Sequence, residues 1–506
     1  MFSTLYKRER KAGLREKRLW NWLIISFLSL PAILHAQPDT LYGKWGGALA
    51  VGKMRLSLVF EITRDSNGDA PEVYLDVPVQ GLRHYRLETA YDADSLLLRV
   101  SARAFGMEYA GRYEKDTIRG VFSQNGMNFP LALSRLSDSL PSLKRPQTPR
   151  PPFPYYTEEV VFYNEKQGVK LSGTLTLPEA GYKGTVAVLV SGSGQQDRDE
   201  TLFGHKPFMV WADYLTRAGI GVLRYDDRGV GGSTGDVENA TSYDFSLDAE
   251  AAVRYLRKRG FSSVGMIGHS EGGMIAPLVA ARDARVGFIV LLAAPGIPCD
   301  SLLLLQQQAI SESESYPQSR IETLLQTNRR IFTLLKSDMP EKALKDSVLY
   351  GLRFLSGSDF PEDELENPVQ EEALQKQANT LMSPWFRYFV QYNPASVLQK
   401  VKCPVLALNG SEDVQVLAGP NTQGIRQALR QAGNRNFSAG ILPGLNHLFQ
   451  QCAACTVGEY AEIEETVNER ALKITADWIR FHKRMKNSNG KPWYMVFQNE
   501  IIFFER

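Results

Sequence analysis

A pentapeptide near the middle of the chain has the pattern of a catalytic serine. Gly268-His269-Ser270-Glu271-Gly272 matches G-x-S-x-G, and it lies between an apolar, strand-like run that ends at Ile267 and a helix-like run over 272–281. A serine on such a strand-to-helix turn is held in a strained conformation, and glycines flank it because larger side chains would clash. The turn exposes the hydroxyl beside the positive end of the helix. The motif therefore predicts Ser270 as a nucleophile.

A serine hydroxyl needs a base, and the six histidines of the chain can be tested by elimination. Four precede Ser270: His35, His84, His205 and His269. Proteins with this turn supply the other two groups downstream, in the order Ser, acid, His, which leaves His447 and His482. His482 falls in an expected C-terminal helix over 459–485 and is interpreted as a solvated helix residue. His447 follows a predicted strand over 437–442, at a strand's carboxyl end, so we take it as the base.

The acid that orients the histidine is expected after the preceding strand. An apolar run over 405–408 leads into Asn409-Gly410-Ser411-Glu412-Asp413. Strand, glycine turn and aspartate is the expected arrangement, so Asp413 is the candidate and Glu412 is its competitor. The role of the acid is to fix the histidine tautomer and to stabilise the imidazolium.

Two backbone N–H groups are needed to stabilise the oxyanion of acyl transfer. One belongs to the residue after the nucleophile, Glu271. The other is expected from the loop after a strand over 185–190, which reads Ser191-Gly192-Ser193-Gly194. Its small residues let the backbone approach a substrate carbonyl. We assign Ser193, with Gly194 as the near alternative.

Polar residues beyond this loop are candidates for the rim of a substrate pocket. Asp197, Arg198 and His205 are the candidates, with a structural role as the alternative for each. The charged segment over 224–233 either contacts substrate or forms a turn held by internal Asp–Arg hydrogen bonds, and we favour the turn. The aromatic residues over 385–392 either line an apolar acyl pocket or pack the core of a lid.

The elements that position these residues follow from the hydrophobic pattern. Over 155–485, apolar strands alternate with helices, which predicts a mostly parallel α/β sheet. Residues 299–397 interrupt the alternation with a helical pattern and are expected to form a cap. Residues 37–136 show period-two strands and are expected to form an all-β sandwich or barrel. The Pro-rich stretch 137–154 is interpreted as a semi-rigid linker, and the tail 486–506 as an extra strand or helix.

The N-terminus predicts an export signal. Basic residues over 7–18 precede an apolar run over 22–34, and Ala36 is a small residue at a cleavage point. The run is shorter than the roughly 20 apolar residues of a membrane span, so residues 1–36 are expected to be a cleaved signal peptide, with a retained anchor as the alternative. We therefore expect an exported protein, periplasmic or secreted, without a stable membrane span.

Composition and cysteine spacing limit cofactors and partners. The chain has 506 residues, 43% hydrophobic and 23% charged, and a formal net charge of +2, which argues against a nucleic-acid partner. Cys452 and Cys455 form a CxxC that is interpreted as a local disulfide or two plain thiols, because a zinc site needs more ligands than the sequence offers. No metal or cofactor is expected, and no oligomeric state is predicted.

Taken together, these motifs resemble a family of exported bacterial α/β hydrolases, often described as esterases and related to serine aminopeptidase-like and dienelactone hydrolase-like branches. The resemblance covers most of 155–480 and rests on 191–199, 204–208, 224–235, 268–273, Ala407-Leu-Asn-Gly410 with Asp413, and Asn446-His-Leu-Phe449. It implies an α/β-hydrolase fold with an N-terminal β domain, and hydrolysis of a small-molecule carboxylic ester through an acyl-enzyme without a cofactor. A serine peptidase of the same fold, with Glu271 and Asp197 holding a substrate amino group, is the alternative. A non-catalytic binding protein is the third hypothesis.

Overall fold

The computed structural model describes residues 41–504 apart from 52–53, 66–69, 78–81, 103–105, 125–126, 137–143, 358–367, 482–492 and 498–499. The expected signal peptide over 1–36, His482 and the linker residues 137–143 lie outside the described residues. Among the helices that are described, none combines the length and the apolar character needed to cross a membrane.

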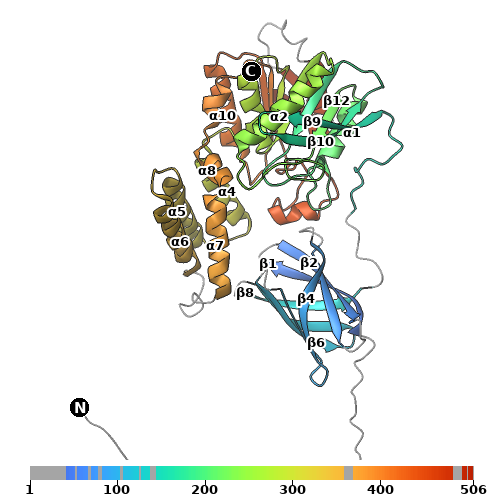
Figure 1. The fold of residues 1–506 in the computed structure, drawn as a ribbon, viewed down its shortest axis with the longest axis vertical. Helices are drawn as coiled ribbons and strands as arrows, with labels where there is room; N and C mark the ends of the chain where they lie inside the picture. The colour runs from blue at the N-terminus through green and yellow to red at the C-terminus, as the bar shows by residue number, and fades with distance from the viewer. Residues whose placement is uncertain are drawn as a thin grey trace, which may run out of the picture. The chain divides into compact units, whose positions relative to one another are not determined.

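The N-terminal β region is a closed barrel of eight antiparallel strands in sequence order (Figure 1). Its inward side chains alternate with exposed ones, as in β6, and the interior is filled by large residues such as Trp45, Phe60 and Tyr109. Of the two expected architectures, the barrel is the one found. The strands are β1 (Gly43–Val51), β2 (Met54–Arg64), β3 (Pro71–Val77), β4 (Leu82–Asp92), β5 (Leu97–Ala102), β6 (Met107–Glu114), β7 (Thr117–Gln124) and β8 (Met127–Arg135).

An eight-stranded sheet follows, in the order β16-β15-β14-β13-β11-β12-β10-β9. The six strands from β16 to β12 run parallel to their neighbours, while β10 pairs antiparallel with β12 and β9. The expected mostly parallel sheet is confirmed, with β9 and β10 as an antiparallel extension. The strands are β9 (Tyr156–Asn164), β10 (Val169–Leu177), β11 (Thr185–Val190), β12 (Gly221–Tyr225), β13 (Ser263–His269), β14 (Ile289–Leu292), β15 (Val405–Gly410) and β16 (Phe437–Leu442).

Helices cover both faces of this sheet. In β11, Val186 and Val188 pack into one hydrophobic cluster and Ala187 and Leu189 into the other, because successive side chains of a strand point to opposite faces. The first cluster includes α2 (Ser242–Lys258), α3 (Gly272–Arg282) and α10 (Ala418–Gln431), and the second includes α1 (Pro207–Arg217) and α11 (Glu469–Phe481). Buried apolar residues on both faces explain why the central strands read as continuous apolar runs.

The expected cap is a set of helices inserted between β14 and β15 (Figure 1). Ile331, Leu335, Leu344 and Val348 form a hydrophobic core of its own. The helices are α4 (Cys299–Ser313), α5 (Gln318–Leu335), α6 (Glu341–Gly357), α7 (Pro368–Met382), α8 (Pro384–Gln391) and α9 (Pro394–Leu398). We call α4–α9 the lid.

The C-terminal part of the chain differs from the predicted single helix, and its tail forms strands. The predicted single helix over 459–485 is instead a short 3-10 helix, η4 (Val457–Ala461), and a separate α11. The intervening chain is held by other contacts: Asn468 donates its backbone N–H to the carbonyl oxygen of Phe449 (2.8 Å). In the tail, β17 (Trp493–Phe497) and β18 (Glu500–Phe504) pair antiparallel, so the tail forms strands and not a helix.

The second half of the linker is bound to the α/β domain. The Arg145 guanidinium donates hydrogen bonds to the carbonyl oxygens of Phe203, Ala461 and Ile463, at 2.7–3.0 Å. Gln147 contacts the backbone of residues 466 and 467. These side-chain hydrogen bonds fix the part of the predicted semi-rigid linker that follows residue 144.

Candidate active site

Ser270 lies on the sharp turn between β13 and α3. Its φ is 52°, in the left-handed region that residues other than glycine rarely adopt. A Cβ on Gly268 would lie 2.0 Å from the carbonyl oxygen of Gly272, and a Cβ on Gly272 would lie 2.1 Å from that of Val190. Both flanking positions therefore require glycine, as the motif predicts, and the strained turn is fixed by the packing around it.

Asp413 and His447 lie on the loops that follow β15 and β16. The Asp413 Oδ2 atom is 2.8 Å from His447 Nδ1, and both side chains are buried. The other carboxylate oxygen accepts the backbone N–H groups of Gln415 and Val416, each at 2.8 Å, which fixes its orientation. With Nδ1 held by Asp413, Nε2 is the ring nitrogen that can take a proton. The competitor Glu412 is exposed and accepts the Ser411 hydroxyl instead.

One pocket of about 380 Å³ brings these loops together under the lid. Its size is in the range of small-ligand sites. Ser270, His447, Ser193 and Glu271 all line it, whereas Gly194, the alternative oxyanion donor, does not. The lid contributes Leu302, Leu303, Gln306, Trp385 and Phe389. Of the lid aromatics, Trp385 and Phe389 line the pocket, and Phe389 also packs in a hydrophobic cluster with Met274 and Leu278.

The loop over 191–194 approaches the nucleophile closely. A Cβ on Gly192 would lie 3.2 Å from the Cβ of Ser270, so this backbone passes directly beside the serine. Ser193, the next residue, lines the same pocket as Ser270. Glu271 begins the turn into α3, where the N–H groups have no acceptor within the helix. The two expected oxyanion donors thus meet at the same pocket.

A buried carboxylate that sequence reasoning missed holds this arrangement. Glu200 Oε1 accepts the backbone N–H of Gly192 (2.8 Å) and lies 2.9 Å from His269 Nδ1. The other His269 nitrogen is 3.1 Å from the carbonyl oxygen of His447. Burial opposes the charged imidazole, but the Glu200 carboxylate outweighs it and raises the pKa of His269. The chain Gly192–Glu200–His269–His447 therefore connects the oxyanion loop to the histidine loop.

Asp227 is a second missed carboxylate. It accepts the Ser191 hydroxyl (2.8 Å) and the backbone N–H of Gln196 (3.1 Å), so it fixes both ends of the oxyanion loop. Burial raises its pKa to about 8, although the Ser191 and Gln196 hydrogen bonds oppose the shift. No local pattern could have singled out Asp227, because its role depends on β11 and β12 lying side by side.

The three candidate rim residues do not line the pocket. Asp197 accepts hydrogen bonds from its own loop, at Asp199 and Thr201. Arg198 forms a bidentate pair with Asp226 (3.0 and 2.8 Å), which ties the loop to the segment after β12. The Asp–Arg hydrogen bonds expected within 224–233 join this segment to other segments instead, as Asp226 and Arg198 do.

His205 is the third rim candidate, and it is fully buried. Its Nδ1 lies 2.8 Å from the Thr466 hydroxyl, and its Nε2 lies 3.1 Å from the Tyr460 carbonyl oxygen. Burial and the nearby Arg145 guanidinium lower its pKa to about 4. The imidazole therefore joins the segment before α1 to the chain at residues 460 and 466, and it does not line the pocket.

This burial predicts a loss of stability in mild acid. The unfolded chain binds a proton at His205 near pH 6.5, whereas the folded protein does so only near pH 4. Stability should therefore fall as pH decreases from 6.5 to 4, by about 2 kcal/mol from this group. Unfolding by denaturant at several pH values measures how the free energy of unfolding depends on pH. This dependence should be weaker in His205→Gln. An equal slope in the variant would contradict the assignment.

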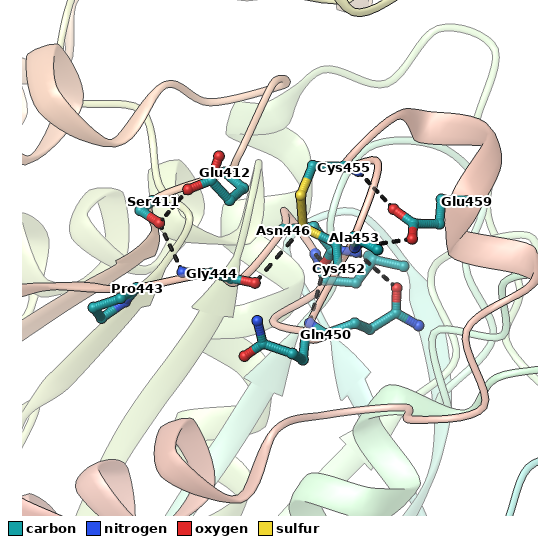
Figure 2. The surroundings of a disulfide bond; sticks show 12 residues. Ser411, Glu412, Pro443, Gly444, Asn446, Gln450, Cys452, Ala453, Cys455 and Glu459 are labelled. Atoms are coloured by element: carbon teal, nitrogen blue, oxygen red, sulfur yellow. Dashed lines mark hydrogen bonds between the residues drawn. A yellow bond between two sulfur atoms is a disulfide. The ribbon is translucent and has the colours of Figure 1, made fainter. Parts of the chain in front are cut away.

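Cys452 and Cys455 form a disulfide just after the His447 loop (Figure 2). Cys452 donates its backbone N–H to the carbonyl oxygen of Gly444 (3.2 Å), and the N–H of Gly444 in turn reaches the Ser411 hydroxyl (2.8 Å). The Glu459 carboxylate accepts the N–H groups of residues 453 and 455. Of the two interpretations of the CxxC, the disulfide is the one found. While both sulfurs are bonded to each other, they cannot act as thiolate ligands for a metal beside Glu459.

The turn closed by the disulfide supports Gly444. Reduction of the disulfide should therefore displace the loops that carry Asp413 and His447. We expect a dithiol reductant to lower kcat by about 3-fold, since small displacements of a catalytic group slow a reaction. A Cys452→Ser/Cys455→Ser variant should start from the lower rate and show no response to reductant. A response in that variant would place the effect at Cys299 or Cys403 instead, whose thiol pKa values are raised by burial.

Parts of the chain are similar to known proteins. The model of the serine aminopeptidase family S33 matches residues 207–345. Esterase EstD of Thermotoga maritima is 27% identical over 313 residues, which are 61% of this chain. The match spans 65% of the length of EstD, slightly less than two thirds. An uncharacterized 31.7 kDa protein of Escherichia coli is 25% identical over 54% of this chain and 84% of its own length.

Solved structures of similar proteins are more distant. An esterase of Pyrococcus furiosus matches with a TM-score of 0.38 and 14% identity, over 64% of this chain and 91% of its own. A proline iminopeptidase of Mycobacterium smegmatis matches with a TM-score of 0.39 and 17% identity, over 65% of this chain and 100% of its own.

The fold and the site define the class of protein. A nucleophile turn between a parallel strand and a helix, with the acid and the histidine following on later strands, is the arrangement of the α/β hydrolases. The chain has this fold, and parts of it are similar to the serine aminopeptidase family model and to an esterase.

Proposed function

We propose that the protein cleaves carboxylic esters through an acyl-enzyme on Ser270. The observation that carries the proposal is the convergence of the strained Ser270 and the Asp413–His447 pair on one pocket. A triad of these groups is a general device for acyl transfer. The name of the EstD relative favours an ester as the substrate.

In the proposed mechanism, His447 Nε2 takes the proton from the Ser270 hydroxyl as its oxygen attacks the ester carbonyl carbon. Asp413 stabilises the imidazolium that forms. The backbone N–H groups of Ser193 and Glu271 receive the developing oxyanion. The tetrahedral intermediate then releases the alcohol, which takes its proton from His447. Water, activated by the same imidazole, hydrolyses the acyl-enzyme and regenerates Ser270.

The pocket favours small substrates. Its volume of about 380 Å³ accommodates a short acyl group with part of the alcohol, and Leu302, Leu303 and Phe389 supply apolar walls. We therefore propose esters of short or medium acyl chains. A panel of nitrophenyl esters of increasing acyl length tests this, with a maximum expected at short chains and a steep decline for long ones.

A peptidase is the second candidate, and one observation favours it. Glu271 lines the pocket, where a substrate amino group would need an acidic partner, whereas Asp197, the other expected carboxylate, does not line it. Aminoacyl-nitroanilides and the nitrophenyl esters compared on one preparation decide between the two. Ester turnover without anilide turnover supports the esterase, and efficient anilide turnover overturns it in favour of the peptidase.

We also propose that the protein is exported after removal of residues 1–36. The support is the basic stretch followed by a short apolar run and Ala36. Expression of the full chain in a Gram-negative host, followed by fractionation and N-terminal sequencing, tests the proposal. A mature protein that begins at Gln37 outside the cytoplasm is expected, and an intact N-terminus in the cytoplasm would contradict it.

A further inference from the structure

The side chain of Glu271 connects the nucleophile turn to the lid. It is 2% exposed, and its Oε1 atom accepts two hydrogen bonds from different parts of the domain. The Ser242 hydroxyl, at the start of α2, lies at 2.6 Å, and the Trp385 indole Nε1, in lid helix α8, lies at 2.8 Å. One carboxylate oxygen therefore fixes the residue after the nucleophile to both the core and the lid.

The same carboxylate also interacts with the oxyanion loop. Burial raises the pKa of Glu271, while hydrogen bonds from the hydroxyls of Ser242 and Ser193 and from the Trp385 indole oppose the shift. Ser193 and Glu271 are the two residues whose backbone N–H groups are placed to receive the oxyanion. Both residues line the pocket, and the Glu271 carboxylate is the group that the Trp385 indole contacts.

Lid helix α8, which carries Trp385, packs against α3. The Trp385 and Phe389 rings lie 5.5 Å apart, and Phe389 packs with Met274 and Leu278 of α3, the helix that follows the nucleophile. Trp385 and Phe389 both line the pocket. A displacement of α8 would therefore be transmitted to Glu271 through the indole hydrogen bond.

We propose that Trp385 is a positioning residue, which acts through the Glu271 carboxylate to hold the oxyanion donors in place when the lid is docked. The inference rests on the proposed acyl-transfer function. Oxyanion donors act only when they lie at hydrogen-bond distance from the developing charge, so a small displacement weakens the transition state more than the bound ester. Loss of the indole N–H should therefore lower kcat and leave KM nearly unchanged.

Substitutions separate the hydrogen bond from the packing. Trp385→Phe keeps an aromatic ring and removes the N–H donor, and we expect kcat to fall by about 10-fold with KM within about 2-fold. Glu271→Met, which removes the acceptor at similar size, should lower kcat at least as much. Glu271→Gln keeps an acceptor oxygen for the Trp385 indole, so it should lower kcat less than Glu271→Met does. Tyr350→Phe alters an exposed aromatic residue of the lid and serves as the matched control.

The decisive measurement is a double-mutant cycle on kcat, with rates normalised by titration of Ser270 with a fluorophosphonate. If Trp385 acts through Glu271, the double variant Trp385→Phe/Glu271→Met should be no slower than Glu271→Met alone. Multiplicative effects, or a rise in KM without a fall in kcat for Trp385→Phe, would overturn the inference and make the indole only a pocket wall.

Failure of this inference is distinguishable from failure of the proposed function. A wild-type protein that neither hydrolyses esters nor reacts with the fluorophosphonate would overturn both. A wild-type protein that does both, alongside a Trp385→Phe variant with unchanged kcat and unchanged labelling rate, would overturn the positioning role alone. The labelling rate does not depend on product release, so it tests the inference even for an ester whose kcat is limited by product release.

Discussion

Replacing Ser270 with alanine is expected to lower kcat for ester hydrolysis by about 10⁴- to 10⁶-fold, the range found when a serine hydrolase loses its nucleophile. The physical reason is that no acyl-enzyme can form, so only the oxyanion donors and binding contribute to the residual rate. Because Ser270 has a φ of 52° on a turn fixed by two glycines, alanine at this position keeps the strain and loses only the hydroxyl.

Initial rates with a short-chain nitrophenyl ester measure this effect. Ser301→Ala, at an exposed serine on α4, is the matched control and should retain full activity. Retention of more than about one tenth of the activity in Ser270→Ala would place the nucleophile elsewhere, since losses below 10-fold fit a supporting residue better than a nucleophile.

Asp413→Asn is expected to have the second largest effect, a loss of about 10⁴-fold in kcat. An amide beside His447 Nδ1 favours the wrong tautomer and gives no charge to stabilise the imidazolium. The buried Asp413 oxygen that accepts two backbone N–H groups can remain an oxygen in asparagine, so the loop should keep its shape. The loss should therefore appear in kcat without a comparable fall in melting temperature.

The neighbouring carboxylate provides the control for this prediction. Glu412 is exposed and accepts only a hydrogen bond from Ser411 among its described side-chain contacts, so Glu412→Gln should stay within about 2-fold of the wild type. Steady-state kinetics of the two variants at one pH compare them directly. A larger loss in Glu412→Gln than in Asp413→Asn would reverse the assignment of the acid.

The parts of the site that are predictable from the sequence are those with local signals. Ser270 is set by a five-residue motif, and Asp413 and His447 follow from the order of strands and the loops at their carboxyl ends. In the structure, Asp413 Oδ2 lies 2.8 Å from His447 Nδ1, although the two residues are 34 positions apart in the sequence. The same logic predicted the parallel sheet, because continuous apolar strands between helices favour it.

The parts that escaped prediction depend on contacts between distant segments. Glu200 supports Gly192 and His269 only because its loop folds back beside the nucleophile turn, and nothing in its neighbourhood in the sequence indicates this. His205 was expected at a polar rim, yet contacts with residues 460 and 466 bury it. Strands with period-two alternation fit a sandwich and a barrel equally well. The pairing that closes the barrel joins β1 to β8, which lie at opposite ends of the domain in the sequence, so no local pattern indicates it.

The most direct test of the central claim is to find where an acyl-transfer inhibitor becomes attached. The wild-type protein is treated with a fluorophosphonate probe, digested, and mapped by mass spectrometry. We predict one adduct per chain, on the peptide that contains Ser270, and its absence from Ser270→Ala. Labelling of another serine at the same rate, or no labelling of folded protein that hydrolyses esters, would contradict the account.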